Sequence, residues 1–222
     1  MVFENGIFKP LGCQSQRNSA HYSLSLSVLS VIHYVMRGVR FHGRGGEGVV
    51  IAAELLANAA FKEGKWVQAF PFFGGERRGA PVTAYARISD RPIRLRGPLY
   101  GPNYVVVLSP FLEQSVNVTE GMKKSGLLVV NSPGRRKRME FEGYRLVKVD
   151  ATKIAVKLGL VVSGVAVVNT VMLGAFVRAS KIVSFDSLKA AIRERWPEEL
   201  GHLNERAAVL GYMLLRGIDK AG

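Results

Sequence analysis

The chain has 222 residues, 48% of them hydrophobic and 22% charged, which predicts a soluble globular protein of one domain, with or without extensions. Its formal net charge of +14 implies an acidic or anionic partner, or else a basic surface with no specific ligand. The only cysteine, Cys13, cannot form an internal disulfide or supply an iron–sulfur cluster or a structural zinc site, so we predict a cytoplasmic chain with no metal of its own.

Residues 1–35 differ in pattern from the rest of the chain. The run "LSLSVLSVIHYV" is apolar but interleaved with serines, and it is shorter than the about 20 residues that span a bilayer. It could pass for the apolar core of a signal peptide, but no small-residue cleavage site follows. We therefore predict a non-core N-terminal extension over 1–35, favour Met36 as the biological start, and assign one domain to 36–222.

Strands and helices alternate from Gly38 onward. The apolar run 38–42 predicts a strand, and residues 49–61 carry apolar side chains at helical spacing, with Gly64 closing that helix. Continuous apolar runs within two of the later strands are typical of burial on both faces. The further predicted strands are 65–70, 80–89, 103–109, 126–132 and 144–150.

The last third of the chain is predicted to be mostly helical. Ser184 is a plausible N-cap with Asp186 in the first turn, and Pro197 starts the final helix. Strands that alternate with helices indicate the α/β class, with an open, mostly parallel sheet flanked by helices, Rossmann-like, and a helical C-terminal part. The predicted helices of this part are 150–159, 166–179, 184–196 and 197–217.

The segment "FHGRGGEGVV", residues 41–50, carries the spacing G-x-G-x-x-G between a strand and a helix. Such a loop lets the backbone approach a ligand, and the N–H groups at the helix start attract an anion. Gly45 is predicted to permit the tight turn. The candidate backbone donors are Gly43, Arg44, Gly45, Gly46 and Gly48.

Two nucleotide-binding patterns do not fit this loop. A dinucleotide fold needs an acidic residue at the end of its second strand, but Glu63 lies at the end of the helix, and "KWVQAF" is followed by no acid. No Gly-Lys-Ser/Thr follows the glycines either, which excludes a Walker-type phosphate loop. Another anion remains open, as does a purely structural role in which the glycines only permit close packing.

A second loop, "FFGGERRGAP" at residues 72–81, lies between two predicted strands. Its Arg77 and Arg78 would offer permanently charged, bidentate donors suited to phosphate. Loops at strand ends of α/β sheets often carry function. The alternative is a solvated turn with an Arg–Glu pair on the surface.

The two loops together make the sequence recognisable. From "RFHGRGGEGVVIAAELLANAAFKEGKWVQAFPFFGGERRGAPVTAYARISDRPI" through "NYVVVLSPFL", "LLVVNS", "VDATKIA" and "NTVMLGAFV", the chain closely resembles the gamma subunit of the 2-oxoacid:ferredoxin oxidoreductases, the pyruvate synthase group. The resemblance covers about residues 37–217. It implies an enzyme that oxidatively decarboxylates a 2-oxoacid on thiamine diphosphate, passes electrons through iron–sulfur clusters to ferredoxin, and delivers the acyl group to coenzyme A.

The resemblance also implies a division of labour between chains. Thiamine diphosphate and the iron–sulfur clusters are expected on partner subunits of alpha, beta and delta type, and this chain alone is expected to bind no cofactor. We expect it to contribute to assembly and to contact the phosphates of coenzyme A through the glycine loop, Arg77 and Arg78. The alternative is that both loops only pack against partner subunits. The chain shows no convincing catalytic residue: His21, His33, His42 and His202 are scattered, and His42 is of interest only for its place beside the loop.

Other basic clusters could meet acidic ferredoxin or a neighbouring subunit. They comprise Arg91, Arg94 and Arg96, and the run 134–138. No nucleic-acid recognition motif and no membrane segment is visible, so neither partner is predicted. The substrate pocket is expected largely on other chains, so nothing in this sequence separates pyruvate from 2-oxoisovalerate. The alternative function is a non-catalytic anion- or nucleotide-binding module of Rossmann-like fold.

Overall fold

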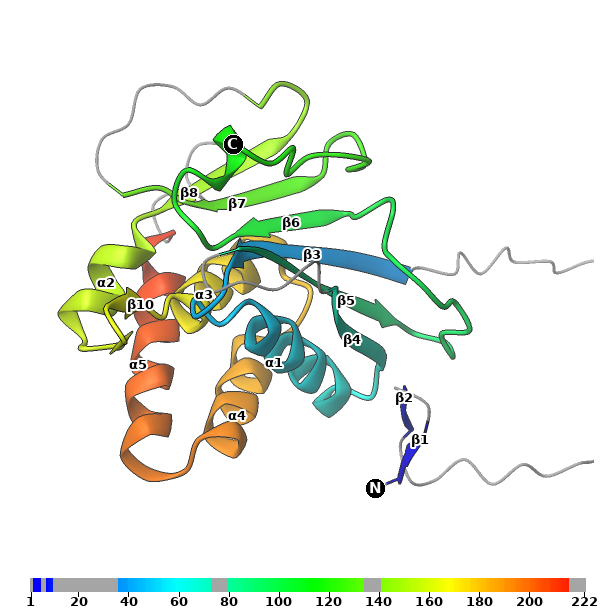
Figure 1. Ribbon diagram of the computed structural model, residues 1–222. Coiled ribbons are helices and arrows are strands. Elements are labelled where there is room, and N and C mark those ends of the chain that lie inside the picture. The colour runs from blue at the N-terminus through cyan, green and yellow to red at the C-terminus, as the bar shows by residue number, and fades with distance from the viewer. Residues whose placement is uncertain (1, 5–6, 10–35, 73–79, 134–140, 216–222) are drawn as a thin grey trace, which may run out of the picture.

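The computed structural model describes residues 2–4, 7–9, 36–72, 80–133 and 141–215. Its centre is a six-stranded sheet that is covered by helices (Figure 1). The strands of this sheet are β3 (Met36–Arg44), β4 (Trp66–Phe72), β5 (Pro81–Ser89), β6 (Tyr104–Val107), β7 (Leu127–Asn131) and β8 (Arg145–Val149). The helices are α1 (Val49–Lys62), α2 (Ala151–Lys157), α3 (Asn169–Ser180), α4 (Phe185–Arg195) and α5 (Glu198–Leu214), with a short 3-10 helix, η1 (Leu112–Gln114).

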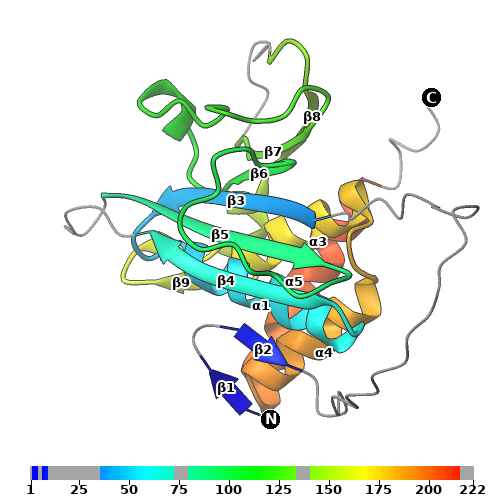
Figure 2. The ribbon, with the colours of Figure 1, turned by 90° about the vertical axis from the view of Figure 1, so that its right-hand side faces the viewer.

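The sheet has the order β4-β5-β3-β6-β7-β8. Strands β3, β6, β7 and β8 pair in parallel, whereas β5 pairs antiparallel with both β3 and β4, so β5 alone runs against the other five. Figure 2 shows β4, β5 and β3 side by side at this antiparallel edge. The predicted α/β fold with a mostly parallel sheet and a helical C-terminal part is therefore confirmed.

All five α-helices pack on one face of the sheet, where the main hydrophobic core lies (Figure 1). The core brings Phe41 of β3 and Tyr104 of β6 against Phe176 of α3, with both rings edge-on to Phe176 at centroid distances of 6.4 Å and 5.6 Å. Edge-to-face contacts of this kind add to the free energy of burying the rings. The apolar side chains of the strands and those of the helices thus pack together in a single hydrophobic layer.

The opposite face of the sheet is covered by loops rather than by helices. Val105 and Val107 of β6 pack there against Leu112 of η1 and against Val118. Along β3 and β5 the same cover is held by two buried arginines. Arg40 donates to the carbonyl oxygens of Val118 (3.0 Å) and Glu120 (2.7 Å). Arg87 donates to those of Gly97 (2.8 Å) and Pro98 (2.9 Å) and to the Gln68 side chain (3.0 Å).

Two small strand pairs were not predicted. β9 (Val161–Val162) and β10 (Val165–Ala166) form an antiparallel hairpin before α3, which begins at Asn169 rather than at the predicted residue 166. β1 (Val2–Glu4) and β2 (Ile7–Lys9) pair as a separate sheet inside the predicted extension. The predicted N-cap of α4 is confirmed, because Ser184 Oγ accepts from Ser187 N at 3.1 Å. No helix in the described ranges combines the length and the apolar character needed to cross a membrane.

Helices α3 and α5 touch backbone to backbone through glycines, and this contact yields a prediction. A Cβ on Gly174 would lie 2.0 Å from the Ala208 carbonyl oxygen. Helix propensity favours alanine over glycine by about 1 kcal/mol. The forced separation of the helices outweighs this gain, so Gly174→Ala should lower the free energy of unfolding by about 1–3 kcal/mol in urea denaturation. The reverse change at an exposed helix position, Ala190→Gly, should lose about 1 kcal/mol and calibrates propensity alone. A Gly174→Ala protein as stable as the wild type would contradict the contact.

Candidate functional site

The β3–α1 loop begins where β3 ends at Arg44. The left-handed backbone of this loop lies at Gly46 (φ 99°) and Gly48 (φ 83°), and Gly48 is the N-cap of α1. The turn therefore depends on these two glycines rather than on Gly45, which the spacing had suggested. Only glycine adopts such angles without strain, so the loop is specified by backbone geometry.

Glu47 places its own carboxylate inside the glycine loop. Its side chain is buried, and Oε2 accepts from Arg44 N at 2.7 Å, with a further hydrogen bond from Ser109. Burial raises the pKa of Glu47, and the two hydrogen bonds partly oppose this rise. Gly43 makes room for the group, since a Cβ there would lie 2.8 Å from Glu47 Oε2 and 2.5 Å from Val49 Cγ2. Gly43 therefore has a packing role.

The predicted N–H donors of the loop differ in whether they already donate to another group of this chain. The N–H of Arg44 is taken by Glu47, and the N–H of Gly45 donates to Ala80 O at 3.4 Å. An anion at this loop would therefore meet the N–H groups of Gly46, Gly48 and the first turn of α1. That turn contains no acidic residue, and its N-cap provides no side-chain hydrogen bond, so the positive end of α1 is not compensated from within the helix.

The N-terminus of α3 lies directly beside that of α1. A Cβ on Gly48 would be only 2.4 Å from Nδ2 of Asn169, the first residue of α3. Helix α3 likewise lacks a side-chain cap and an acidic residue in its first turn. Asn169 Oδ1 accepts from Thr170 N at 2.8 Å, whereas its buried Nδ2 finds no acceptor in the described chain. Two positive helix ends therefore converge next to the glycine loop.

A groove of about 440 Å³ opens from this point. Its floor includes Gly46, Gly48 and Asn169, and Asn204 adds a second amide that is already bonded to Thr170 and to the Leu200 carbonyl. The walls are largely apolar. They are formed by Ile51, Leu160, Val161, Val162, Val167, Trp196, Leu200 and Leu203. A groove with apolar walls and a few polar groups at its base is typical of a small-molecule site.

His42 lies at the end of β3 but has no catalytic environment. It is 6% exposed, its Nδ1 is 3.5 Å from Thr83 Oγ1, and its Nε2 has no partner in the described chain. Burial, reinforced by the charge of Arg40, lowers the pKa of His42 to about 3. The imidazole is thus neutral at physiological pH and is packed within the loop-covered face of the sheet.

The arginines named from the sequence fall partly outside the described residues, and these include Arg77 and Arg78. Ala80, the described residue before β5, accepts from Gly45 N at 3.4 Å, so the start of β5 lies beside the glycine loop. Arg91, Arg94 and Arg96 are exposed in the loop after β5. The run 134–138 is also outside the described residues.

The family model and the most similar curated proteins all concern pyruvate oxidoreductases. Residues 38–214 match the family model described as pyruvate ferredoxin/flavodoxin oxidoreductase. The chain is 48% identical over 174 residues to the pyruvate/ketoisovalerate oxidoreductases common subunit gamma of Thermococcus kodakarensis, covering 77% of this chain and 92% of that protein. It is 50% identical over 174 residues to pyruvate synthase subunit PorC of Methanocaldococcus jannaschii, covering 78% and 94%.

Solved structures agree with this. The pyruvate oxidoreductase subunit PORC of Thermotoga maritima superposes with a TM-score of 0.65 at 34% identity, covering 80% of this chain and 96% of that one. A 2-oxoglutarate:ferredoxin oxidoreductase of Magnetococcus marinus, solved with 2-oxoglutarate, coenzyme A and succinyl-CoA, superposes with a TM-score of 0.66 at 22% identity. This chain spans 31% of that longer one, and at this identity the likeness shows the fold alone.

The two left-handed glycines provide a matched pair of variants. Gly46→Ala meets its nearest atoms only at 3.7 Å, so it should lose about 1–2 kcal/mol of unfolding free energy through its positive φ. Gly48→Ala carries the same strain and also meets Nδ2, Cγ and Cβ of Asn169 at 2.4, 2.8 and 3.0 Å, so the whole Asn169 side chain must shift. It should be less stable than Gly46→Ala by about 1–3 kcal/mol in thermal or urea unfolding. Equal losses would show that the α1–α3 contact is looser than described.

The buried His42 predicts a dependence of stability on pH. Its pKa is about 3 in the folded chain and 6.5 when unfolded, so the unfolded state binds the extra proton between these values. The stability is present above about pH 6.5 and is lost as the pH falls, by at most about 1.4 kcal/mol per pH unit. His42→Gln, which does not titrate, should flatten this slope in urea denaturation between about pH 7 and pH 5. Glu47 is common to both proteins and cancels from the difference; identical slopes would refute the assignment.

Proposed function

Because the chain belongs to the pyruvate ferredoxin/flavodoxin oxidoreductase family, we propose that it is the gamma subunit of a multi-subunit 2-oxoacid:ferredoxin oxidoreductase. The complete enzyme oxidatively decarboxylates a 2-oxoacid to acyl-CoA and transfers the electrons to ferredoxin. The observation that carries this proposal is the match along 92% and 94% of two relatives that are named as subunits of such enzymes. Pyruvate occurs in both names and is the substrate that we favour.

The chain's own side chains do not fit an iron–sulfur cluster. Such a cluster is held by four cysteine thiolates, and this chain contains one cysteine. In the described ranges, moreover, no three His, Cys, Asp or Glu side chains gather as metal ligands. We therefore assign the clusters and thiamine diphosphate to the alpha, beta and delta subunits, and we give this chain a role in binding and assembly rather than in bond making.

Coenzyme A is the ligand that we propose for the glycine-loop end. The converging N-termini of α1 and α3, which lack side-chain caps, suit the negative charge of its diphosphate. The adjoining groove has the largely apolar walls and the buried amide groups that suit its pantetheine arm. Arg77 and Arg78, which lie outside the described residues, would supply bidentate phosphate contacts.

Co-purification tests the proposed function directly. The full chain should be tagged at its C-terminus, expressed with the other subunits in an anaerobic host, and purified without reducing the complex to its parts. We expect alpha, beta and delta chains to elute with it, and ferredoxin reduction to require both coenzyme A and a 2-oxoacid. Pyruvate, 2-oxoisovalerate and 2-oxoglutarate should be compared. A chain that elutes alone, with no 2-oxoacid-dependent reduction, would refute the assignment.

Arg78 provides the test of the coenzyme A contact. Arg78→Ala should remove a charged hydrogen bond worth roughly 1.5–3 kcal/mol and raise the KM for coenzyme A about 10- to 100-fold, with the KM for the 2-oxoacid nearly unchanged. Arg78→Lys should rescue only partly, because it keeps the charge and loses the bidentate geometry. Arg91→Ala, in the exposed loop after β5, is the matched control. If Arg78 only holds a partner subunit, the assembled fraction will keep a normal KM for coenzyme A and the complex will dissociate more readily.

A further inference from the structure

Positive side chains from separate parts of the chain gather at the C-terminus of α3, at the opposite end of the sheet from the glycine loop. They are contributed by the start of β3, the turn before β4, the start of β8 and the end of α3 itself. We call this surface the basic end. Its cations are Arg37, Lys65, Arg145, Arg178 and Lys181.

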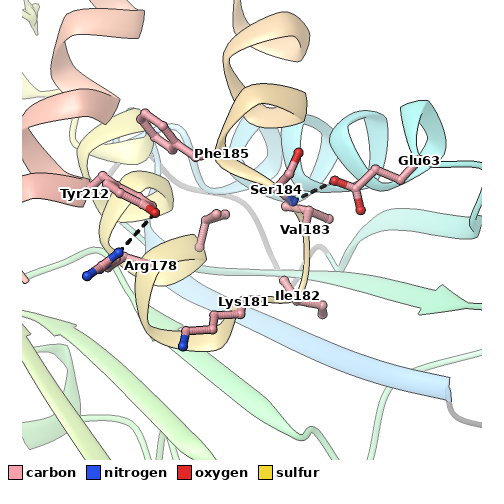
Figure 3. A pocket seen from close by; sticks show the side chains of 9 residues that line it. Glu63, Arg178, Lys181, Ile182, Val183, Ser184, Phe185 and Tyr212 are labelled. Carbon is pink, nitrogen blue, oxygen red and sulfur yellow. Dashed lines mark hydrogen bonds between the residues drawn. The ribbon is translucent and has the colours of Figure 1, made fainter. Parts of the chain in front are cut away.

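The larger of two hollows at the basic end has a volume of about 570 Å³ (Figure 3). Phe185 and Tyr212 form one wall, with their rings stacked at a centroid distance of 4.2 Å. Arg178 Nη1 donates to Tyr212 Oη at 3.3 Å, and its guanidinium lies 5.2 Å from the centre of that ring. Both contacts hold the guanidinium of Arg178 against the side chain of Tyr212.

A second hollow of about 180 Å³ adjoins the first, and both are lined by Lys181 and Ile182. Arg37 reaches it from β3 and donates to Tyr104 Oη at 2.8 Å. Lys181 follows directly after α3 with a left-handed backbone (φ 52°). It is one of the two residues that line both hollows. The two hollows therefore form one continuous basic surface.

The acidic residues of this surface already have partners. Asp90 forms a salt bridge with Lys65, and Glu63 Oε1 accepts from Ser184 N at 2.6 Å. Arg145 is accounted for by its bond to the Ala179 carbonyl (3.1 Å) at the negative end of α3. Within the described part of the chain, the side chains of Arg37 and Lys181 form no salt bridge. Lys181 is the C-cap of α3 and donates its backbone N–H to Val177 O at 2.9 Å, so the negative helix end accounts for its position as it does for Arg145. Helix capping does not account for Arg37.

We propose that the basic end is an interface for an acidic segment of another subunit of the complex. This inference rests on the proposed function, which supplies the partner subunits. Like charges held close together on one surface repel one another, and opposite charges on a partner relieve this repulsion and orient the encounter. Four of the cations, Arg37, Lys65, Arg178 and Lys181, line the two hollows instead of converging on one point, which suits an extended acidic segment better than a single small anion. The half-buried side chains of Phe185, Tyr212 and Ile182 supply apolar contact between the charges.

Carbodiimide cross-linking of the native complex tests this proposal at Lys181. The reagent joins a lysine amine to a carboxylate that already lies at salt-bridge distance. We expect mass spectrometry to identify an amide between Lys181 and an Asp or Glu of another subunit. The Lys189–Asp186 pair, 2.7 Å apart within this chain, is the internal positive control. Lys181→Arg keeps the charge and should preserve assembly while abolishing the cross-link. A cross-link from Lys181 to an acid of this same chain, such as Asp219, or none at all, would overturn the proposal.

Charge reversal provides the second measurement. Arg37→Glu combined with Lys181→Glu should weaken subunit association at least about tenfold and lower the salt concentration at which the complex dissociates in native mass spectrometry. Lys153→Glu combined with Lys157→Glu, on exposed positions of α2, changes the net charge equally and should have a much smaller effect. Equal effects of the two double variants would overturn the interface. If the wild-type chain forms no complex, the proposed function itself fails, which is a separate outcome.

Discussion

Two buried guanidinium groups hold the loop cover against the sheet, and the rest of the architecture depends on them. Arg40 and Arg87 are 7% and 3% exposed, and the hydrogen bonds described for them go to carbonyl oxygens and to one amide instead of to carboxylates. Burial lowers the pKa of both, yet a guanidinium stays charged in proteins. Removing these bonds would leave a buried charge without compensation, so the loops at 97–98 and 118–120 are fixed to the strands.

This constraint explains why the sequence predicted the strands better than the layers. The apolar runs of β6 and β7 correctly indicated burial on both faces, but a helix and a well-packed loop bury a valine equally well. Nothing in the periodicity distinguishes them. The signal that separates the two faces of β3 and β5 is polar: Arg40, His42 and Arg87 point away from the helices, where a helix-covered sheet would have placed apolar residues. The two-residue strands β9 and β10 are too short for any periodicity to reveal.

The candidate site could be located from the sequence but not described in detail. The G-x-G-x-x-G spacing identified the turn, because spaced glycines between a strand and a helix allow the chain to reverse tightly there. The spacing does not show which glycines carry the positive φ, and it could not show that Gly48 contacts α3, a helix more than a hundred residues further on. The inward turn of Glu47 was equally hidden, since a glutamate in a loop is usually solvated and this one is held by Arg44 N and Ser109. The local sequence pattern thus determines where the turn lies, and tertiary contacts determine which polar groups of the turn can reach a ligand.

The two ends of the sheet suit the two tasks that we propose for this chain, which are the binding of coenzyme A and the binding of another subunit. The relative in Thermococcus kodakarensis is named as a common subunit of pyruvate and ketoisovalerate oxidoreductases. A subunit that serves both enzymes cannot contain the pocket that separates a methyl from an isopropyl side chain, because such a pocket would fit only one of them. What the two reactions of that relative have in common is the acyl acceptor and the neighbouring subunits. The glycine loop with its converging helix N-termini suits an anionic acceptor, and the basic end suits an acidic protein surface. Helix α3 carries Asn169 at its first residue and Arg178 near its last. This one helix of twelve residues therefore connects the glycine loop with the basic end.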